Sequence, residues 1–149
     1  MTKQKGFSLI ELLIVVAIIL IIAGIAIPNL AKAKIAANEA SAVQSLRTIT
    51  TAEVTYASTY GTGYTNLATL GISGMIDTIL SNGKKSGYTF TAVPGGGTGT
   101  SIDPFTTYTS TGIRQSTNTG TRMFCADSSG VIRYVTTPSG CDSSSAPLQ

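Results

Sequence analysis

The first third of the chain is defined by an unbroken apolar run. Residues 7–27 contain only three interruptions, Ser8, Glu11 and Gly24. As an α-helix this run would be about 31 Å long, enough to cross the hydrocarbon core of a bilayer. Lys3 and Lys5 precede it, and flanking lysines keep their end of a membrane helix in the cytoplasm. The pattern predicts a membrane helix whose N-terminal end is cytoplasmic and whose continuation after Pro28 lies outside.

Residues 29–60 continue as an amphipathic helix. Apolar side chains recur at helical spacing between polar ones, at Ile35, Val43, Leu46, Ile49 and Tyr56. Gly61 and Gly63 end the pattern, which predicts one helix of about 53 residues. Pro28 removes a backbone hydrogen-bond donor and Gly24 weakens the helix nearby, so a kink or local melting is expected there.

A cleaved secretory signal is the alternative interpretation of the apolar run. Such a signal also begins with basic residues, but its apolar region is shorter and ends at a polar break with small residues. Here the run is long, contains the charged Glu11 and leads directly into a second helical pattern. The pattern therefore favours a retained membrane helix.

Beyond residue 60 the chain is rich in Thr, Ser and Gly and predicts a small sheet. Asn66 is expected to cap a helical turn over Leu67–Leu70, with Gly71 and Gly83 ending short turns. Strands are predicted at Gly87–Val93, where Tyr88, Phe90 and Ala92 alternate with threonines, at Phe105–Ser110, and at Thr121–Asp127 and Val131–Val135.

The last two of these strands flank Ser-Ser-Gly and form the strongest hairpin pattern in the chain. The predicted fold class is α+β: a three- or four-stranded antiparallel sheet laid on the second half of the long helix. The segment Ser143–Gln149 is expected to be a frayed tail.

Cys125 and Cys141 are the two cysteines of the chain. An even pair in a region predicted to lie outside the membrane indicates a disulfide, worth roughly 3 kcal/mol for a loop of this length. Two unrelated buried thiols are the alternative.

Charge and composition exclude several functions. Two of the ten cationic residues, Lys3 and Lys5, lie in the first six positions, and no basic patch with interleaved aromatic residues follows, so nucleic-acid binding is not indicated. The chain has no histidine, which excludes a Ser-His-Asp triad and a His-ligated zinc. A phosphate-binding loop around Lys84 is excluded, because Thr78 stands where the motif requires its first glycine and Lys85 stands where it requires Ser or Thr. No enzymatic activity and no cofactor are expected.

The segment KGFSLIELLIVVAIILIIAGIAIP resembles the N-terminus of type IV prepilins, including the pseudopilins of type II secretion. In that family a membrane-bound prepilin peptidase cleaves after the glycine, here Gly6, and methylates the new N-terminal residue, here Phe7. Glu11 matches the family's glutamate, and Pro28 matches the proline at which the helix bends or melts in filaments. Many relatives carry a glycine eight residues before that proline, where this chain has Leu20; Gly24 is the substitute here.

The resemblance implies the type IV pilin fold, with a cleaved leader (residues 1–6), a membrane and filament-core helix (7–28), its amphipathic continuation (29–60) and an outer sheet domain with a C-terminal disulfide region (61–149). The resemblance also offers a reason for the charged Glu11 inside the apolar run. A lone carboxylate at the bilayer centre costs about 2.5–3.5 kcal/mol. Pairing with the Phe7 amine of a neighbouring subunit would offset this only in the assembled filament and so set the register. Pairing with its own Phe7 amine is the alternative.

The function implied is that of a major structural subunit of a type IV pilus. Its partners would be further copies of itself, the prepilin peptidase, and an inner-membrane assembly platform with a cytoplasmic ATPase. The precursor would reside in the inner membrane and the product on the cell surface. A major pseudopilin of type II secretion is the alternative, and a monomeric membrane-tethered binding domain is a rival of another class.

Two further patterns give weaker indications. Asp127 and Asp142 border the cysteines and are candidate calcium ligands, as the pseudopilin resemblance suggests, against a role as solvated turn residues. Tyr56, Tyr60 and Tyr64 would form one helical stripe suited to electron conduction, but core packing at the helix–sheet junction is the favoured interpretation.

Overall fold

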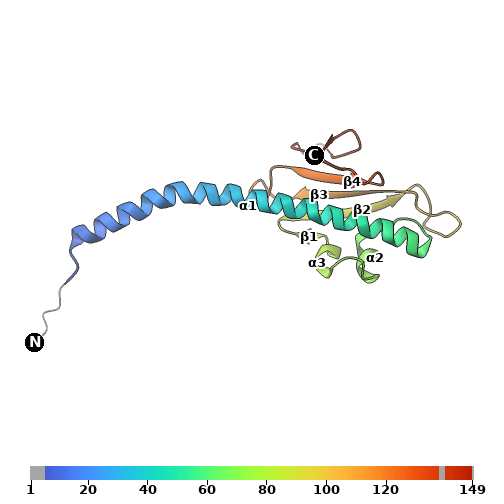
Figure 1. Cartoon of the computed structure of the whole chain (residues 1–149), viewed down its shortest axis with the longest axis horizontal. Coiled ribbons are helices and arrows are strands. Elements are labelled where there is room, and N and C mark those ends of the chain that lie inside the picture. The colour runs from blue at the N-terminus through green and yellow to red at the C-terminus, as the bar shows by residue number, and fades with distance from the viewer. Residues whose placement is uncertain (1–5, 138–139, 149) are drawn as a thin grey trace, which may run out of the picture. The chain divides into compact units, whose positions relative to one another are not determined.

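The computed structural model describes residues 6–137 and 140–148. Lys3, Lys5 and the rest of the predicted leader before Gly6 lie outside the described residues. The contact pattern divides the chain into two units, the first ending at Lys34 and the second beginning at Ile35, and each is described by itself. Figure 1 traces the elements.

The helix α1 extends over Leu9–Tyr60 and includes Pro28. The helical assignment is continuous at this proline in the single chain, so melting at Gly24 and Pro28 remains a prediction for a filament. α1 ends where the glycines predicted: Gly61 has a φ of +68°, and its N–H donates to the carbonyl of Ala57 at 3.1 Å. A glycine in this left-handed conformation is a common helix terminator.

Two short helices follow in the second unit. α2 spans Leu67–Ile72, and the side chain of Asn66 caps it by accepting from the N–H of Thr69, as predicted. Gly71 lies inside α2, so the expectation that it ends the turn is wrong. α3 spans Thr78–Ser81 and is capped by Asp77, whose Oδ1 accepts from the N–H of Leu80 at 2.6 Å.

The sheet is antiparallel throughout and its strands follow chain order. Four strands contain at least four residues: β2 (Tyr88–Gly95), β3 (Thr107–Arg114), β4 (Met123–Asp127) and β5 (Ile132–Val135). The two-residue strands β1 (Lys84–Lys85) and β6 (Ala146–Pro147) complete the edges. The predicted antiparallel sheet is confirmed, with β1 and β6 added to the four expected strands. The fraying expected from Ser143 onward is wrong, since β6 pairs with β5.

The prediction for β3 has the wrong boundaries. Pairing begins at Thr107 rather than Phe105 and continues four residues beyond Ser110, to Arg114. The side chains of β3 that are buried are Tyr108, Ser110 and Gly112, so the core-facing side of the strand has only one large apolar residue. Gly112 allows a close approach: a Cβ there would lie 3.1 Å from the ring of Phe90. Because small residues occupy most of the buried positions of β3, its sequence lacks the alternation of apolar and polar residues by which strands are recognised.

The core lies between the second half of α1 and one face of the sheet (Figure 1). Helix α1 contributes Ala42, Leu46, Ile49 and Ala52, and β2 contributes Tyr88, Phe90 and Ala92, the three residues predicted to face inward. Val43 and Tyr56 pack at the margin of this cluster. Helices α2 and α3 add Leu67, Leu70 and Leu80.

Candidate functional site

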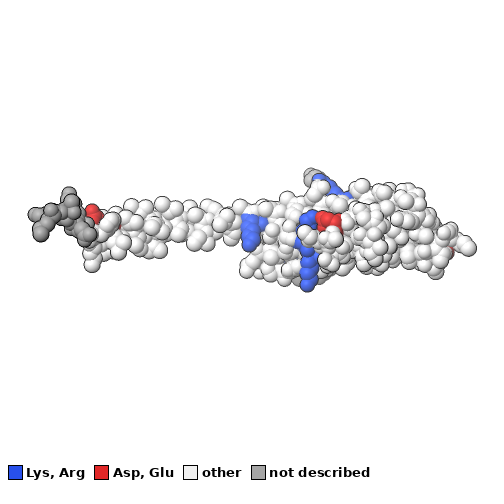
Figure 2. Space-filling view, turned by 90° about the horizontal axis from the view of Figure 1, so that it is seen from below, with Lys and Arg blue, Asp and Glu red and all other residues white. Residues whose placement is uncertain are grey.

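The first unit carries the segment that the sequence singled out. Large apolar side chains from Phe7 to Leu30 are between 46% and 81% exposed. An 18-residue window of α1 has a mean hydropathy of 3.2, and none of it is buried within the chain. By length and composition this is a helix able to cross a membrane. Figure 2 shows how few charged side chains accompany it. An exposed apolar surface of this size requires lipid or other protein around it.

Glu11 occupies the first turn of α1. Its Oε2 accepts a hydrogen bond from the backbone N–H of Ser8 at 2.9 Å. The first N–H groups of a helix have no partner within it, so a carboxylate at this position satisfies one of them and complements the helix dipole. This hydrogen bond comes from a backbone amide and occupies one of the two carboxylate oxygens. Gly6 and Phe7 precede the helix and are exposed.

The second unit holds two buried carboxylates that sequence reasoning missed. Glu39 and Glu53 lie on α1 and are 5% and 0% exposed. With Ala42, Leu46 and Ile49 they form a stripe at alternating steps of three and four residues, the spacing of one helix face. Their place in this stripe was the available signal, because a residue spaced like the core positions shares the burial of the core.

Glu39 joins α1 to the connection between β3 and β4. Its Oε1 accepts from the backbone N–H and the hydroxyl of Thr121 at 2.8 and 2.6 Å and from the N–H of Arg122 at 3.0 Å. Its Oε2 pairs with Nε of Arg122 at 2.7 Å. Burial alone would raise the pKa of Glu39, but these hydrogen bonds outweigh it and lower the pKa to about 2.

Arg122 is itself held in place. Its guanidinium lies 5.5 Å from the ring centroids of both Phe124 and Tyr134, and its carbonyl accepts from the hydroxyl of Tyr88 at 2.8 Å. Stacking on aromatic rings and pairing with a carboxylate are both favourable for arginine. The Glu39–Arg122 contact is therefore a structural tie between helix and sheet.

Glu53 has a different environment. Its Oε2 accepts from the N–H of Thr65 at 2.8 Å, while Oε1 has no hydrogen-bond partner among the described protein atoms. Burial raises the pKa of Glu53 to about 7, and the single backbone hydrogen bond only partly opposes this. Of the two ion pairs among the described residues, neither includes Glu53.

The disulfide between Cys125 and Cys141 is present, with a Cα–Cα separation of 5.7 Å. It ties β4 to the segment that leads into β6. The neighbouring aspartates cap their own turns: Asp127 Oδ1 accepts from the N–H of Ser129 at 2.8 Å, and Asp142 Oδ1 accepts from the N–H of Ser144 at 2.9 Å. Hydrogen bonds from these serines lower the pKa of both aspartates.

The described residues contain no group of three or more His, Cys, Asp or Glu side chains that could hold a metal ion. Among the described residues, no third acidic side chain therefore joins Asp127 and Asp142 at the calcium site that the sequence suggested.

The three tyrosines do not form one stripe. Tyr56 and Tyr60 stack within α1, with ring centroids 4.5 Å apart, but the helix ends before Tyr64. Tyr64 packs instead against Tyr108 of β3, at 4.7 Å. Core packing at the helix–sheet junction, the favoured interpretation, describes Tyr56 and Tyr64.

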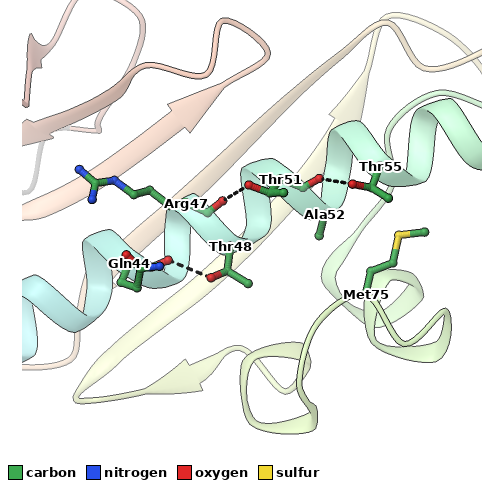
Figure 3. Close-up of a pocket in the computed structure, with 7 residues that line it drawn as sticks. All are labelled: Gln44, Arg47, Thr48, Thr51, Ala52, Thr55 and Met75. Atoms are coloured by element: carbon green, nitrogen blue, oxygen red, sulfur yellow. Dashed lines mark hydrogen bonds between the residues drawn. The ribbon is translucent and has the colours of Figure 1, made fainter.

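An open hollow beside Met75 is the remaining feature of the helix surface (Figure 3). It is lined by Gln44, Arg47, Thr48, Thr51, Ala52, Thr55 and Met75. The three threonine hydroxyls donate to helix carbonyls one turn earlier, at 2.8 to 3.1 Å. They are therefore already satisfied, and the lining contains no acidic side chain, cysteine or histidine with which to perform chemistry.

Comparison with known proteins gives matches that cover a limited part of the chain. The family model of the prokaryotic N-terminal methylation motif matches residues 1–27. A type IV major pilin protein, PilA of Myxococcus xanthus, is 44% identical over 54 residues, which are 36% of this chain and 24% of PilA. PilA4 of Thermus thermophilus, a type IV wide pilus major component, is 59% identical over 39 residues, 26% of this chain and 30% of PilA4.

The matched stretches thus span less than a third of the length of these two relatives. No solved structure matches the chain. The matched N-terminal segment leads into a long helix that packs on an antiparallel sheet with a C-terminal disulfide, which is the fold that the resemblance implied. Segment and architecture together confirm that this chain resembles the type IV pilins.

Proposed function

We propose that this chain is the major structural subunit of a type IV pilus, without enzymatic activity. The observation that carries the proposal is the apolar half of α1, exposed along its whole length and matched by the methylation-motif model. In the precursor this helix lies in the inner membrane with its N-terminal end cytoplasmic. In the product it packs among the same helices of further copies, and residues 61–149 form the outer domain.

Processing is part of the proposal. A prepilin peptidase cleaves between Gly6 and Phe7 and methylates the Phe7 amine, and an inner-membrane platform with a cytoplasmic ATPase assembles the product. Residues 7–28 then form the filament core, residues 29–60 continue the helix, and the helix bends or melts near Gly24 and Pro28. The segment before Phe7 carries Lys3 and Lys5 and is lost on cleavage.

A pseudopilin of type II secretion and a monomeric membrane tether are the competing functions. Both relatives named above are major pilus components, which favours the pilus. A tether needs neither cleavage at Gly6 nor a carboxylate in its apolar helix.

Glu11 sets the register in this proposal. One oxygen remains for a neighbour's Phe7 amine when the other accepts from Ser8. A buried charge pair compensates for its desolvation only when both partners are present, and removing one partner typically costs about 3–5 kcal/mol. Loss of the Glu11 charge should therefore disfavour addition of each subunit by more than about a hundredfold.

Two measurements test the function. Intact mass spectrometry of sheared surface fibres should give a chain that begins at Phe7 and carries one additional methyl group. Fibre yield, measured beside total subunit in membranes, should fall to little or nothing for Glu11→Gln at normal subunit abundance. Glutamine can still accept from the Ser8 N–H, so this change removes the charge and leaves the helix cap.

Asp103→Asn is the matched control, because Asp103 lies in an exposed loop of the second unit and its loss also removes one negative charge. Its fibre yield should be normal. A mature chain that begins at Met1, or normal yield from Glu11→Gln, would contradict the proposal.

A further inference from the structure

The carboxyl group of Glu53 is buried without a counter-ion. Its side chain is fully enclosed between α1 and the sheet, and only Oε2 has a protein partner, the N–H of Thr65. A buried carboxylate with one neutral hydrogen bond is costly when ionised. The neutral acid is different, because its proton makes the second oxygen a donor.

Two acceptors for that proton lie in the same cluster. The hydroxyls of Thr50 and Tyr108 are also buried and lie against each other, and a hydrogen bond with Thr50 acts to lower the pKa of Tyr108. Tyr108 is 2% exposed, and burial, with Glu53 among its charged neighbours, raises its pKa. A hydroxyl that is already hydrogen-bonded still has an unused lone pair, so this pair of hydroxyls between α1 and β3 can accept the proton that a neutral Glu53 carries.

The nearby cation is Arg133 of β5, which lines one hollow with Tyr108 and Asp127 and lowers the pKa of Asp127, but it is not among the groups that act on Glu53. Tyr64 faces the cluster from the connection between α1 and α2, Tyr108 from β3, and Asp127 acts on Tyr108 from the end of β4. Both described ion pairs use other carboxylates, those of Glu39 and Asp77. A proton is therefore the positive charge that can neutralise Glu53.

The hydrogen-bond partner of Glu53 lies in a short segment that pairs with a neighbouring loop. Thr65 belongs to the connection of residues 61–66, which in turn binds the glycine-rich loop of residues 96–106. Phe105 N–H donates to the carbonyl of Thr62 at 3.0 Å, and Tyr64 N–H donates to the carbonyl of Phe105 at 3.2 Å. Gly63, at a φ of +82°, forms the parallel bridge to Phe105.

The approach at Gly63 is too close for any side chain, since an added Cβ would overlap the backbone of Phe105. The connection and the loop therefore form one paired strip, and the Glu53 side chain ties this strip to α1.

We propose that Glu53 is a proton-operated latch on the connection between α1 and α2. In the neutral state its hydroxyl donates within the cluster with Thr50 and Tyr108, while its other oxygen holds the Thr65 N–H. When the proton leaves to solvent, the carboxylate must reach water, and it does so by releasing Thr65. The connection and the loop paired with it then open together, and the rest of the sheet is unaffected.

The direction of the pH dependence follows from the raised pKa. In the open state the carboxyl titrates near its ordinary value of 4.5, and in the closed state near 7. The closed state therefore binds the proton more tightly, and closure weakens as pH rises from 4.5 to 7. Each pKa unit of difference changes the closing equilibrium about tenfold, so a total change on the order of a hundredfold is expected.

Hydrogen exchange of the full chain in detergent micelles tests the latch. Protection of peptides covering residues 61–66 and 96–106, corrected for the intrinsic rate at each pH, should fall roughly a hundredfold between pH 5 and pH 8. Protection of the β4–β5 hairpin should stay constant. In Glu53→Gln, which has no proton to lose, protection of all these peptides should be the same at both pH values.

Glu39→Gln is the matched control. It removes a buried carboxylate from the same helix and should keep the pH-dependent opening of residues 61–66. If protection in the unmodified chain does not change with pH, or if Glu53→Gln loses protection in the same way, the latch is wrong.

A direct titration needs no variant. The carboxyl ¹³C shift of Glu53 should titrate near neutral pH, in step with the loss of protection. A midpoint near the ordinary value of 4.5 would overturn the proposal even if the segment opens with pH.

Discussion

Glu39→Gln offers a quantitative test of the tie between α1 and the sheet. The substitution keeps the shape of the side chain and removes its charge. It leaves Thr121 and Arg122 with a weaker acceptor and Arg122 without a counter-ion. The helix and the connection before β4 should stay in place, because Tyr88 and Phe124 still hold Arg122.

The magnitude follows from the pKa of Glu39. It lies near 2 in the folded chain and at 4.5 in the unfolded chain. One pKa unit corresponds to 1.36 kcal/mol, so the carboxylate contributes about 3 kcal/mol of folding free energy. Because the folded pKa is lowered, this contribution is fully present above pH 4.5 and is lost as pH falls through 4.5 toward 2.

The assay is the free energy of unfolding of the outer domain, measured by denaturant titration of the full chain in detergent from pH 2 to pH 6. The difference between the unmodified chain and Glu39→Gln should be about 3 kcal/mol at pH 5 and close to zero at pH 2. The difference isolates Glu39 from Asp77, Asp127 and Asp142, whose pKa values are also lowered.

A difference that stays constant down to pH 2 would refute this reasoning, since it would mean that glutamine disturbs the packing and not the charge. A loss below about 1 kcal/mol at pH 5 would show that the tie is a weak surface interaction instead.

Two further predictions concern the disulfide and the proline. Replacing both Cys125 and Cys141 by serine should destabilise the outer domain by about 2–5 kcal/mol in the same unfolding assay and leave membrane insertion unchanged; alkylation of both thiols without prior reduction would show instead that the bond is absent from the protein. Pro28→Ala should permit assembly but change filament stiffness or helical rise, because it restores the helical N–H at residue 28, and helical reconstruction of fibres would measure this. Unchanged rise and stiffness would show that the proline does not shape the filament.

Patterned segments of the fold were predictable from sequence. The alternation of Tyr88, Phe90 and Ala92 placed β2, the Asn66 cap placed α2, and Gly61 ended α1 where expected. In each case one local preference agrees with the tertiary structure. Strands β1 and β6 were missed because two residues contain no period, and their pairing depends on neighbouring strands.

The sequence alone identifies the proposed assembly residues, but it does not reveal the roles of the buried carboxylates. Gly6, Phe7 and Glu11 form a contiguous motif, so no folding is needed to recognise them. The roles of Glu39 and Glu53 depend on partners 82 and 12 positions away, which only the fold brings together. Their opposite pKa shifts could not be predicted, since both residues look alike in sequence and differ in the number of donors that surround them.

The two units satisfy different physical demands, which suggests where assembly is encoded. Residues 7–30 leave their apolar side chains exposed, so in the proposed pilus subunit the surface that packs on lipid and on neighbouring copies would lie there. The second unit buries its own core and ties β4 to its C-terminal segment by a disulfide, so its sequence is constrained mainly by its own folding. The methylation-motif match accordingly covers residues 1–27. Variants of Glu11 should therefore lower fibre yield and leave the stability of the outer domain unchanged. Variants of Glu39 should lower the stability of the outer domain and leave fibre yield unchanged as long as the domain is folded. A Glu39 variant that abolishes fibres while the outer domain remains folded would contradict this division.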